Sequence, residues 1–505
     1  MDDGFASLDA VKSSGPGRVR KVMERGVKVE PMGPSEPPAP PPEAPVSPPA
    51  AGWDLSHDQL ALDAGKAGLD EDGRYVPTWS RWLHWTGSHF AHDDKMLTYA
   101  VVRRFLRSVA QRIERWAEKE AANLDAKAAE KLRAWAKAEC RTLRHKQTVA
   151  AVIDLARSND AIAARPEEFD ANPWLLATPG GTVDLQTGTL REARRADLIS
   201  KCCAVTPAPG RPEVWLKFLE TTFDANPDVI TFIHLALGYS LTGFTREHKL
   251  FFCFGSGANG KSTLLNLLAW LMGDYARRAP AETFLAKTGT SHPTDIAGFQ
   301  GARLIVASEL SRGRSWDEEV IKNLTGGDKL SARFMRGDFF DFDPVGKLWI
   351  AGNTMPSFKG VDEAIRRRLV LIPFAVTIPA AERDPELLDK LKAEAPQILS
   401  WMIEGARKWA HSGLKVPAEL VAASGYYLDN EDTLGQFLDD ETIRDPAAFV
   451  TASDLHQRFG QWAAAQGLGS WTRRTLSKEL ETRGFSAHRR DHGRGFLGLR
   501  LRMIG

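Results

Sequence analysis

The chain has 505 residues, of which 43% are hydrophobic, and it carries a formal net charge of +1 at pH 7. This length predicts two to four domains, and the near-neutral charge excludes a general attraction to polyanions, so any nucleic-acid contact must come from a local basic surface. No apolar run approaches membrane-spanning length, the start MDDGFASLDA is not a signal peptide, and the four cysteines lack CxxC spacing, so we expect a cytoplasmic protein without membrane contact, zinc site or disulfide framework.

Residues 1–52 are predicted to form a disordered, proline-rich tail and linker. Pro31–Gly52 is roughly half proline, a composition that favours an extended spacer. Scattered basic residues lie in Gly15–Lys28. They are typical of a solvated tail, with a weak tether to nucleic acid or to a partner as the alternative.

Residues 53–210 are predicted to form an N-terminal domain that is helical at first and then mixed α+β. The pattern is helical from Trp53 to about Ser158, most clearly in Met96–Val149, which is rich in Ala, Glu, Lys, Arg and Leu and has no proline. Between residues 165 and 205, paired turn signals flank short apolar pieces, which favours loops and short strands.

An aromatic cluster with three histidines precedes the long helices. The aromatic residues are Trp79, Trp82, Trp85 and Phe90, and the histidines are His84, His89 and His92. His89 and Asp93 have the spacing of neighbours on a helix, but the glycine-containing stretch around them is a weak helix former. Packing or surface roles therefore suit these histidines better than metal binding.

The stretch Lys249–Asn266 (KLFFCFGSGANGKSTLLN) combines a short apolar run, a glycine-rich turn and an amphipathic helix. Gly255, four residues, then Gly260, Lys261 and Ser262 give the spacing of a phosphate-binding P-loop. Glycines let successive backbone N–H groups turn toward phosphate oxygens, and the helix directs its positive N-terminus at the same anion. We predict that Lys261 contacts the β- and γ-phosphates of ATP and that Ser262 binds Mg²⁺. The predicted ATP-binding residues are Gly255, Ser256, Gly257, Ala258, Asn259, Gly260, Lys261, Ser262 and Thr263.

Two later apolar strands end in polar residues that suit ATP hydrolysis. Arg303–Glu309 (RLIVASE) ends in a carboxylate, and Glu309 can orient or deprotonate the attacking water and help to bind Mg²⁺. Leu348–Asn353 (LWIAGN) ends in an amide, and Asn353 can hydrogen-bond the γ-phosphate or the water. A turn-forming role is the alternative for Asn353.

Lys329–Phe342 alternates in a way that predicts a β-hairpin. Its expected tip is Met335-Arg336-Gly337-Asp338, with Arg333 close by. Basic side chains at such a tip are suited to the phosphates of a nucleic-acid strand. We therefore predict DNA contacts by Lys329, Arg333 and Arg336, with a solvated loop as the alternative.

Three adjacent arginines stand directly before an apolar strand in Asp362–Phe374 (DEAIRRRLVLIPF). Solubility alone does not explain them, whereas an arginine supplied in trans to the γ-phosphate of a neighbouring subunit does. Arg368 is the first choice for this role and Arg367 the second.

The ATPase core with a helical lid is predicted over residues 211–415, and residues 416–505 are predicted to form a small winged-helix-like domain. From Trp471 onwards the sequence has nine Arg or Lys residues against three acids, and its last part reads as a basic β-hairpin. DNA contact is predicted through Arg473, Arg474, Lys478, Arg489 and Arg490. An oligomerisation or partner-docking domain is the alternative.

The ordered motifs GSGANGKST, GARLIVASEL, IKNLTGGDKLSARF, LWIAGNTMP and DEAIRRRLVLIPF resemble the superfamily 3 helicases, and most of all the helicase half of phage, plasmid and poxvirus primase-helicases. The resemblance covers about residues 75–380. It implies an α/β core of the AAA+ type, a parallel sheet flanked by helices, which assembles into a ring, usually a hexamer, and translocates on single-stranded DNA. It also implies that Asn353 is the sensor, that Arg368 is the trans finger and that Lys322–Arg336 leads into the DNA-binding hairpin.

We therefore expect an ATP-dependent DNA helicase that serves replication of a phage, plasmid or other mobile element, with 3′–5′ polarity implied by the resemblance. It would act on single-stranded or forked DNA, in a bacterial cell or the host of such an element. Because residues 1–75 are too short and too rich in proline for a primase domain, priming would come from a separate primase or polymerase, or would be absent. The alternatives are an ATP-binding switch or loader that docks a replication partner without unwinding DNA, and a small-molecule kinase.

Overall fold

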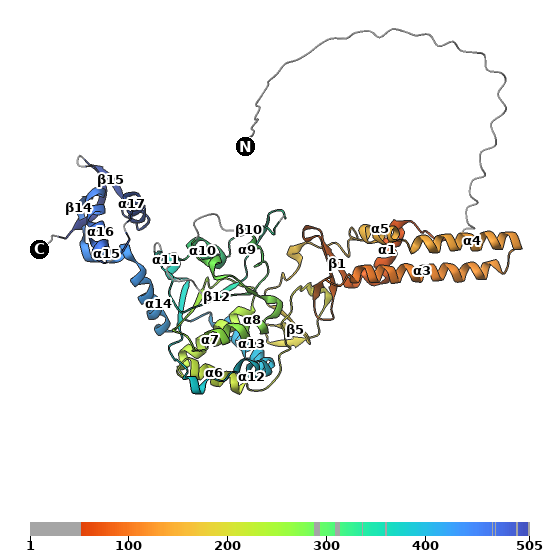
Figure 1. The fold of residues 1–505 in the computed structure, drawn as a ribbon, viewed down its shortest axis with the longest axis horizontal. Helices are drawn as coiled ribbons and strands as arrows, with labels where there is room; N and C mark the ends of the chain where they lie inside the picture. Colours follow the sequence, from red (N-terminus) through yellow and green to blue (C-terminus); the bar gives the residue numbers. More distant parts are fainter. Residues whose placement is uncertain are drawn as a thin grey trace, which may run out of the picture. The chain divides into compact units, whose positions relative to one another are not determined.

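The structure is a computed structural model, and it describes residues 52–286, 293–308, 314–335, 337–358, 361–466, 468–469, 471–490 and 493–502 (Figure 1). The chain divides into two units, Met1–Trp53 and Asp54–Gly505. Nearly all of the first unit lies outside the described residues, and so does the predicted tail. Glu309 and Arg336, two residues with predicted roles, also lie outside them.

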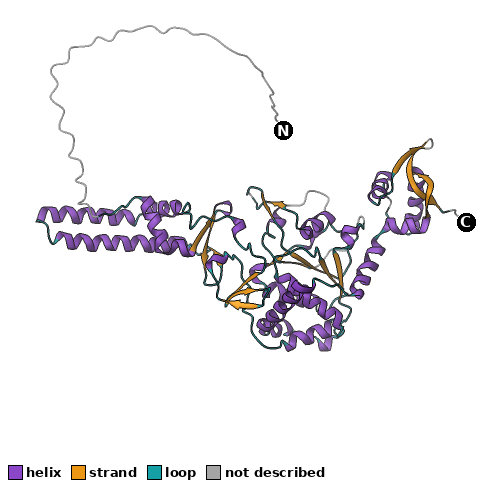
Figure 2. Ribbon diagram, turned by 180° about the vertical axis from the view of Figure 1, so that it is seen from behind, coloured by secondary structure: helices purple, strands orange, loops and turns teal. Residues whose placement is uncertain are grey.

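A parallel sheet of five strands forms the centre of the second unit (Figure 2). Its strand order is β13-β7-β12-β9-β8, and every neighbouring pair is parallel. The strands are β7 (Leu250–Phe254), β8 (Ala276–Arg278), β9 (Leu304–Ala307), β12 (Lys347–Gly352) and β13 (Leu369–Pro373). Because the strands are parallel, the loops that follow them all leave from one edge of the sheet, which is where ligands bind in such folds.

Alternate side chains of these strands enter two hydrophobic cores on opposite faces of the sheet. Phe251 and Trp349 belong to one core, whereas Phe252 and Ile350 belong to the other, and all four are fully buried. Burial of each such side chain stabilises the fold by roughly 1.5–3 kcal/mol. Both faces of the sheet are therefore covered, as the near-continuous apolar runs of the strands predict.

Helices supply the other side of each core. The first core is covered by α6 (Glu213–Thr222), α7 (Pro227–Leu241), α8 (Lys261–Leu271), α12 (Leu387–Ala393) and α13 (Ala395–Ser412). The second is covered by α9 (Pro293–Ala297), α10 (Glu318–Gly326), α11 (Glu363–Arg366) and α14 (Ala418–Glu431), with a small hairpin of β10 (Leu330–Ala332) and β11 (Phe340–Phe342). The mixed α/β class is thus confirmed, with helices on both faces of a parallel sheet.

The N-terminal part contains a small antiparallel sheet where the sequence predicted helix. After α1 (His57–Ala64), a π-helical turn at Gly65–Leu69 and α2 (Asp70–Asp72), the strands β1 (Gly73–Val76), β2 (Arg81–Trp85) and β3 (Phe90–His92) pair in that order. Trp79, Trp82 and Trp85 recur every three residues, which favours a helix in the sequence, and Gly87, with φ of 102°, closes the turn between β2 and β3. Pairing between these strands therefore overrides the helical pattern here.

The long helices were predicted correctly. The helices α3 (Leu97–Ala121) and α4 (Ala126–Leu143) form an antiparallel hairpin, followed by α5 (Lys146–Ala156). Trp116 and Trp135 meet edge to face across the hairpin, with ring centroids 6.1 Å apart. A second antiparallel sheet follows, with strands β4 (Leu175–Thr178), β5 (Gly181–Asp184) and β6 (Thr189–Arg191), which agrees with the predicted short strands.

The C-terminal part has three helices and a three-stranded antiparallel sheet around a core of its own. In chain order its elements are α15 (Thr433–Glu441), β14 (Thr442–Thr451), α16 (Ala452–Ala465), α17 (Arg473–Thr482), β15 (Ala487–Arg490) and β16 (Gly493–Leu501). The helices and the hairpin were predicted, but β14 was missed. Pro446 lies in β14 where its pairing with β16 shifts register between Arg444 and Phe449, and such a proline argues against a strand in sequence.

Candidate nucleotide-binding site

The predicted P-loop connects β7 to α8 at the edge of the sheet where the strands end. Gly260 has φ of 89°, and a Cβ there would lie 2.9 Å from the ring of Phe218 on α6. At Gly255 a Cβ would lie 2.3 Å from the carbonyl oxygen of Phe374, directly after β13. Glycine is therefore required at both positions, at Gly260 by backbone conformation and at Gly255 by close packing.

Lys261, the first residue of α8, has a buried side chain that is 5% exposed. Its Nζ donates hydrogen bonds to the carbonyl oxygen of Gly255 at 2.7 Å and to Oδ1 of Asn259 at 2.8 Å. Among the described residues, no carboxylate pairs with it. Burial lowers the pKa of Lys261 below its usual value. A buried cation with only neutral oxygen partners, at a helix N-terminus, fits an anionic ligand such as a phosphate.

The loop is held in place by the segment that follows β13. Asn259 donates from Nδ2 to the carbonyl oxygen of Phe374 at 2.8 Å, and the backbone N–H of Ile378 donates to the carbonyl oxygen of Ala258 at 2.9 Å. Asn259 thus contacts Phe374 with its nitrogen and Lys261 with its oxygen. The arrangement orients the lysine before any ligand is bound.

Asn353 and Ser308 lie at the same edge of the sheet as the P-loop. In the parallel register Gly352 pairs with Phe254, so Asn353, the next residue, follows β12 level with the start of the loop. The backbone N–H of Gly255 donates to the carbonyl oxygen of Gly352, at 3.4 Å. Ser308 follows β9 directly and is exposed. The strands therefore bring Asn353 to the loop, while the placement of Glu309 is outside the described residues.

The three arginines lie at the opposite edge of the sheet, before β13, and each has different surroundings. Arg368 is buried and donates from Nε to Oγ1 of Thr325 at 3.0 Å and from a terminal nitrogen to the carbonyl oxygen of Ala364 at 2.9 Å. Arg366 pairs with Asp429 at 2.7 Å. Arg367 is exposed, and its side chain has no ion-pair partner among the described residues.

The β10–β11 hairpin carries aromatic side chains at its tip as well as the predicted basic ones. Phe334, Met335 and Phe339 are large apolar side chains that are 51%, 80% and 60% exposed. The guanidinium of Arg333 lies 4.8 Å from the ring centroid of Phe339, and Lys329 is exposed. The prediction from the sequence named only the basic residues of the hairpin. The run RFMRGDFF shows the apolar residues beside them as well.

The predicted basic residues of the C-terminal part are all exposed. Arg473, Arg474 and Lys478 lie on α17, and Arg489 and Arg490 lie on β15. Arg490 lies over the ring of Phe449 at 5.0 Å. Arg473, Arg474, Lys478 and Arg489 form no ion pair with any carboxylate among the described residues.

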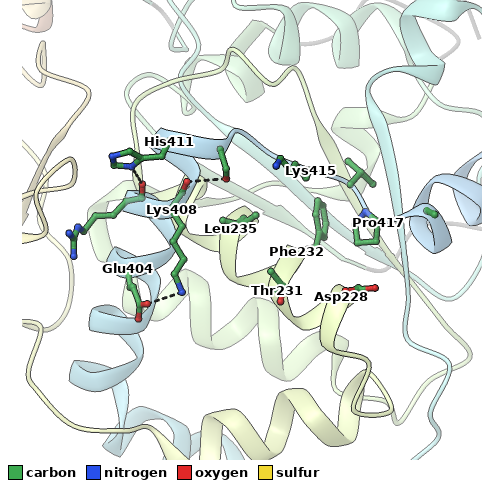
Figure 3. A pocket seen from close by; sticks show the side chains of 13 residues that line it. Asp228, Thr231, Phe232, Leu235, Glu404, Lys408, His411, Lys415 and Pro417 are labelled. Atoms are coloured by element: carbon green, nitrogen blue, oxygen red, sulfur yellow. Dashed lines mark hydrogen bonds and ion pairs between the residues drawn. The ribbon is translucent and has the colours of Figure 1, made fainter.

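A pocket of about 800 Å³ lies between α7 and α13, and no P-loop residue lines it (Figure 3). Its lining combines basic side chains such as Lys408 and Lys415 with the acids Asp228 and Glu404. Lys408 and Glu404 form an ion pair at 2.8 Å. We therefore assign no nucleotide to this pocket.

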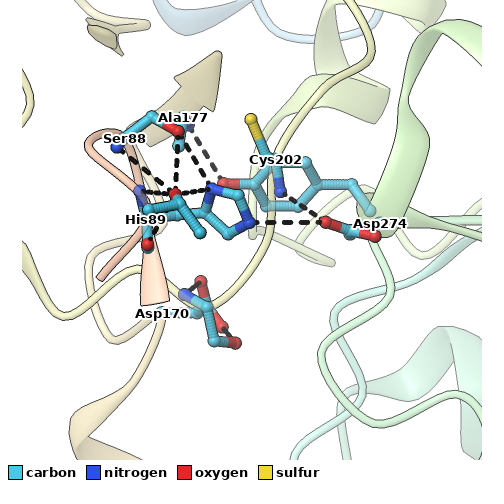
Figure 4. A network of polar contacts seen from close by, with 9 residues as sticks. Ser88, His89, Asp170, Ala177, Cys202 and Asp274 are labelled. Carbon is cyan, nitrogen blue, oxygen red and sulfur yellow. Dashed lines mark hydrogen bonds and ion pairs between the residues drawn. The ribbon is translucent and has the colours of Figure 1, made fainter. Parts of the chain in front are cut away.

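A polar network joins the N-terminal part to the end of α8 (Figure 4). His89 accepts or donates at Nδ1 to Oγ of Ser88 at 3.0 Å, and its Nε2 lies 3.9 Å from Oδ2 of Asp274. The backbone N–H of Asp274 donates to the carbonyl oxygen of Cys202. In the part of the chain that the structure describes, no group of three His, Cys, Asp or Glu side chains is arranged to hold a metal ion. No motif in the sequence predicted this long-range contact.

Within the described ranges, none of the helices combines the length and the apolar character needed to cross a membrane. The glycine-rich loop, the buried lysine and the parallel sheet define the class of protein: a mixed α/β fold with a core like that of the P-loop nucleotide-binding proteins.

Comparison with known proteins agrees with this class. Residues 66–224 match the family described as D5 N terminal like, and residues 253–368 match a family of unknown function, DUF5906. The mimivirus of Acanthamoeba polyphaga has a relative named "Putative helicase L207/L206", 25% identical over 319 residues. Invertebrate iridescent virus 6 has "Putative helicase 184R", 29% identical over 224 residues, and the Sputnik virophage has "Putative helicase V13", 26% identical over 247 residues.

These matches cover 58%, 42% and 45% of the chain and 33%, 23% and 32% of the three relatives, so the chain spans a third or less of their length. The chain is also similar to a solved structure of the NrS-1 C-terminal region, with a TM-score of 0.40 and 12% identity, covering 69% of this chain and 88% of that one. The match to the D5 N terminal like family and the relatives named as putative helicases agree with the resemblance to the superfamily 3 helicases of the phage, plasmid and poxvirus primase-helicase type.

Proposed function

We propose that the chain is an ATP-dependent DNA helicase that serves replication of a phage, plasmid or other mobile element. The observation that carries this proposal is the buried Lys261, which has only neutral partners, at the N-terminus of α8. A buried ammonium group is costly unless an anion compensates it, and a triphosphate supplies that anion. The relatives named as helicases support DNA unwinding as the process that uses the nucleotide.

The residues of the loop, Gly255 to Thr263, would hold the phosphates of ATP. Ser262 is exposed at the start of α8, and its hydroxyl would bind Mg²⁺, which would neutralise charge on the phosphates. Asn353 is level with the loop and would hydrogen-bond the γ-phosphate or the attacking water. Glu309, which follows Ser308, would activate that water and help to hold the metal.

The position of the arginines supports a site shared between subunits of an AAA+-type ring, which we propose to be a homohexamer. The P-loop lies at one edge of the sheet and the arginines lie at the other, so an arginine of this chain would reach the nucleotide of a neighbour and not its own. Arg367 suits this role better than Arg368, because Arg367 is exposed whereas Arg368 is buried and bonded to Thr325 and Ala364.

We propose that the β10–β11 hairpin contacts single-stranded DNA through Lys329, Arg333 and Arg336, and that the exposed Phe334 and Phe339 stack on bases. The order helix, strand, two helices and a β-hairpin in residues 433–501 supports a winged-helix-like domain. Its basic residues on α17 and β15 would bind DNA phosphates. The remaining parts of the proposal are translocation from 3′ to 5′, a cytoplasmic location and a separate primase or polymerase.

A strand-displacement assay on forked DNA tests the proposal, with the wild type compared with Lys261→Ala. We expect ATP-dependent unwinding by the wild type and none by the variant, and we expect single-stranded DNA to stimulate ATP hydrolysis. Arg333→Ala should lose that stimulation and keep ATP binding. ATP hydrolysis that DNA does not change, without unwinding, would contradict the helicase and favour the loader.

A further inference from the structure

The helical hairpin of α3 and α4 concentrates positive charge that the proposed helicase mechanism does not use. Residues 97–144 contain twelve Arg or Lys and six Asp or Glu residues, a formal charge of +6, whereas the whole chain has +1. All twelve basic side chains are exposed. The rest of the chain is therefore net acidic, although residues 471–505 are also locally basic.

A groove of about 710 Å³ runs along one side of the hairpin. Its floor includes Ala117, Ala136 and the buried Cys140, small residues that let the two helices approach closely. Its walls are charged: Glu114 and Glu118 come from α3, and Arg133, Lys137, Arg141 and Arg144 come from α4. We call this feature, together with Arg103 and Arg107 described below, the basic groove.

The two acids of the groove are already neutralised within the hairpin. Arg133 pairs with Glu118 at 3.1 Å, and Arg144 pairs with Glu114 at 2.9 Å. Lys137 and Arg141 have no carboxylate partner among the described residues. The walls of the groove therefore present two free positive charges beyond its internal ion pairs.

Arg103 and Arg107 extend the same row toward the start of α3. Arg107 precedes Glu114 by seven residues and Arg103 precedes it by eleven, which is about two and three helical turns, so these side chains share the face of α3 that lines the groove. Neither has an ion-pair partner among the described residues. From Arg103 to the level of Lys137, near Ile113, the row is about 15 Å long at 1.5 Å per residue.

These dimensions and this chemistry suit a nucleic-acid backbone. Four unpaired cations along about 15 Å match about four successive phosphates of one strand, which are spaced 3.4 Å apart along the axis of a duplex. Trp116 and Trp135 are half-buried against each other, so these rings are not available to stack on unpaired bases. Contacts limited to phosphates favour a duplex over a single strand, because a duplex has the higher charge density.

We propose that the basic groove of the α3–α4 hairpin binds the phosphate backbone of double-stranded DNA. This contact is separate from the nucleotide site and from the β10–β11 hairpin, and it needs no ATP. It gives the protein a grip on the duplex ahead of the strand that it unwinds, and it is independent of base sequence.

The test compares two double variants of the full chain that remove the same charge. Arg107→Gln with Arg141→Gln neutralises the groove. Arg115→Gln with Lys131→Gln neutralises exposed residues on the outer faces of the same two helices and serves as the matched control. Glutamine keeps a high helix propensity, so both variants should fold. The probes are a fluorescein-labelled duplex of about 30 base pairs and a single strand of the same length, measured by fluorescence anisotropy without nucleotide at several salt concentrations.

We expect the groove variant to bind the duplex roughly tenfold more weakly at moderate salt, with the slope of log K against log salt reduced by about two, and the control to stay within about twofold of the wild type. Equal losses in both variants, or no loss in either, would overturn the proposal, and so would a loss confined to the single strand. Failure of the helicase proposal is distinguishable, because a chain that never unwinds forked DNA but loses duplex affinity only in the groove variant would refute the first proposal and support this one.

Discussion

Lys261 and Lys347 are buried at opposite edges of the same sheet. They differ in the number of hydrogen-bond acceptors around the ammonium group, a difference that separates a candidate binding residue from a structural one. Lys347, at the start of β12, donates from Nζ to the carbonyl oxygens of Thr242, Val345 and Phe244. Lys261 donates to two oxygens, and the third donor of its ammonium group has no acceptor among the described residues.

The difference shows that a buried cation alone does not mark a site. Burial lowers the pKa of both lysines, that of Lys347 strongly. Lys347 uses all three N–H donors of its ammonium group to join the end of α7 and the loop after it to β12. It therefore has no N–H donor available for a ligand. Lys261 has an unused donor beside a glycine-rich loop and a helix N-terminus, so it remains able to bind an anion.

The largest effect that this comparison predicts is on catalysis. Lys261→Met should reduce the ATPase turnover by roughly 10³-fold, because an electrostatic contact to the transferred phosphoryl group is lost. Its thermal midpoint should change by only a few degrees. Steady-state ATPase assays and thermal melts measure both quantities. A variant that keeps its turnover would refute the assigned role of Lys261.

An effect of similar size is expected for the arginine that we propose to act at a neighbour's nucleotide. Arg367→Ala should lower turnover by about 10³-fold without loss of ATP binding, because a trans arginine acts on the transition state. Mixed with Lys261→Met subunits, it should recover part of the activity, since some interfaces then pair an intact P-loop with an intact arginine. If the mixture recovers nothing while Arg368→Ala shows the full kinetic loss, Arg368 is the finger.

The matching change at the structural lysine should act on stability instead. Lys347→Met leaves three buried carbonyl oxygens without their shared donor, and we expect it to lower the free energy of unfolding by about 2–3 kcal/mol. Chemical denaturation gives this value. Folded Lys347→Met protein should hydrolyse ATP at close to the wild-type rate, and a selective kinetic defect would mean that Lys347 also serves the site.

The smallest predicted effect is on the dependence of stability on pH. Burial lowers the pKa of His84, His89, His92 and His234 below their ordinary value of 6.5. The unfolded chain therefore binds protons more readily, and stability should fall as pH decreases below about 6.5. Thermal midpoints measured between pH 8 and pH 5 should show this, and His89→Gln should reduce the slope slightly. A midpoint that rises on acidification would contradict the assignment.

The parts predicted well from the sequence are those in which local pattern and long-range packing agree. The apolar run before Gly255 and the glycine spacing correctly predicted a strand, a turn and a helix that begins at Lys261. The strand ends correctly predicted that Asn353 lies level with this turn, because parallel strands meet at one edge, and the roles of these residues stay predictions. Strand β14 was missed because Pro446 disfavours strands locally, while pairing with β16 decides the outcome. The burial of Arg368 was equally hidden, because its partner Thr325 lies on α10, 43 residues earlier in the chain.

The junction at the end of α8 links the nucleotide site to the N-terminal part mechanically. The backbone N–H of Ala204 donates to the carbonyl oxygen of Leu271, the last residue of α8, and that of Asp274 donates to Cys202. One end of this helix follows the glycine-rich loop, and the other end is hydrogen-bonded to residues 202–204. A tilt of α8 would therefore either move residues 202–204 with it or break these hydrogen bonds.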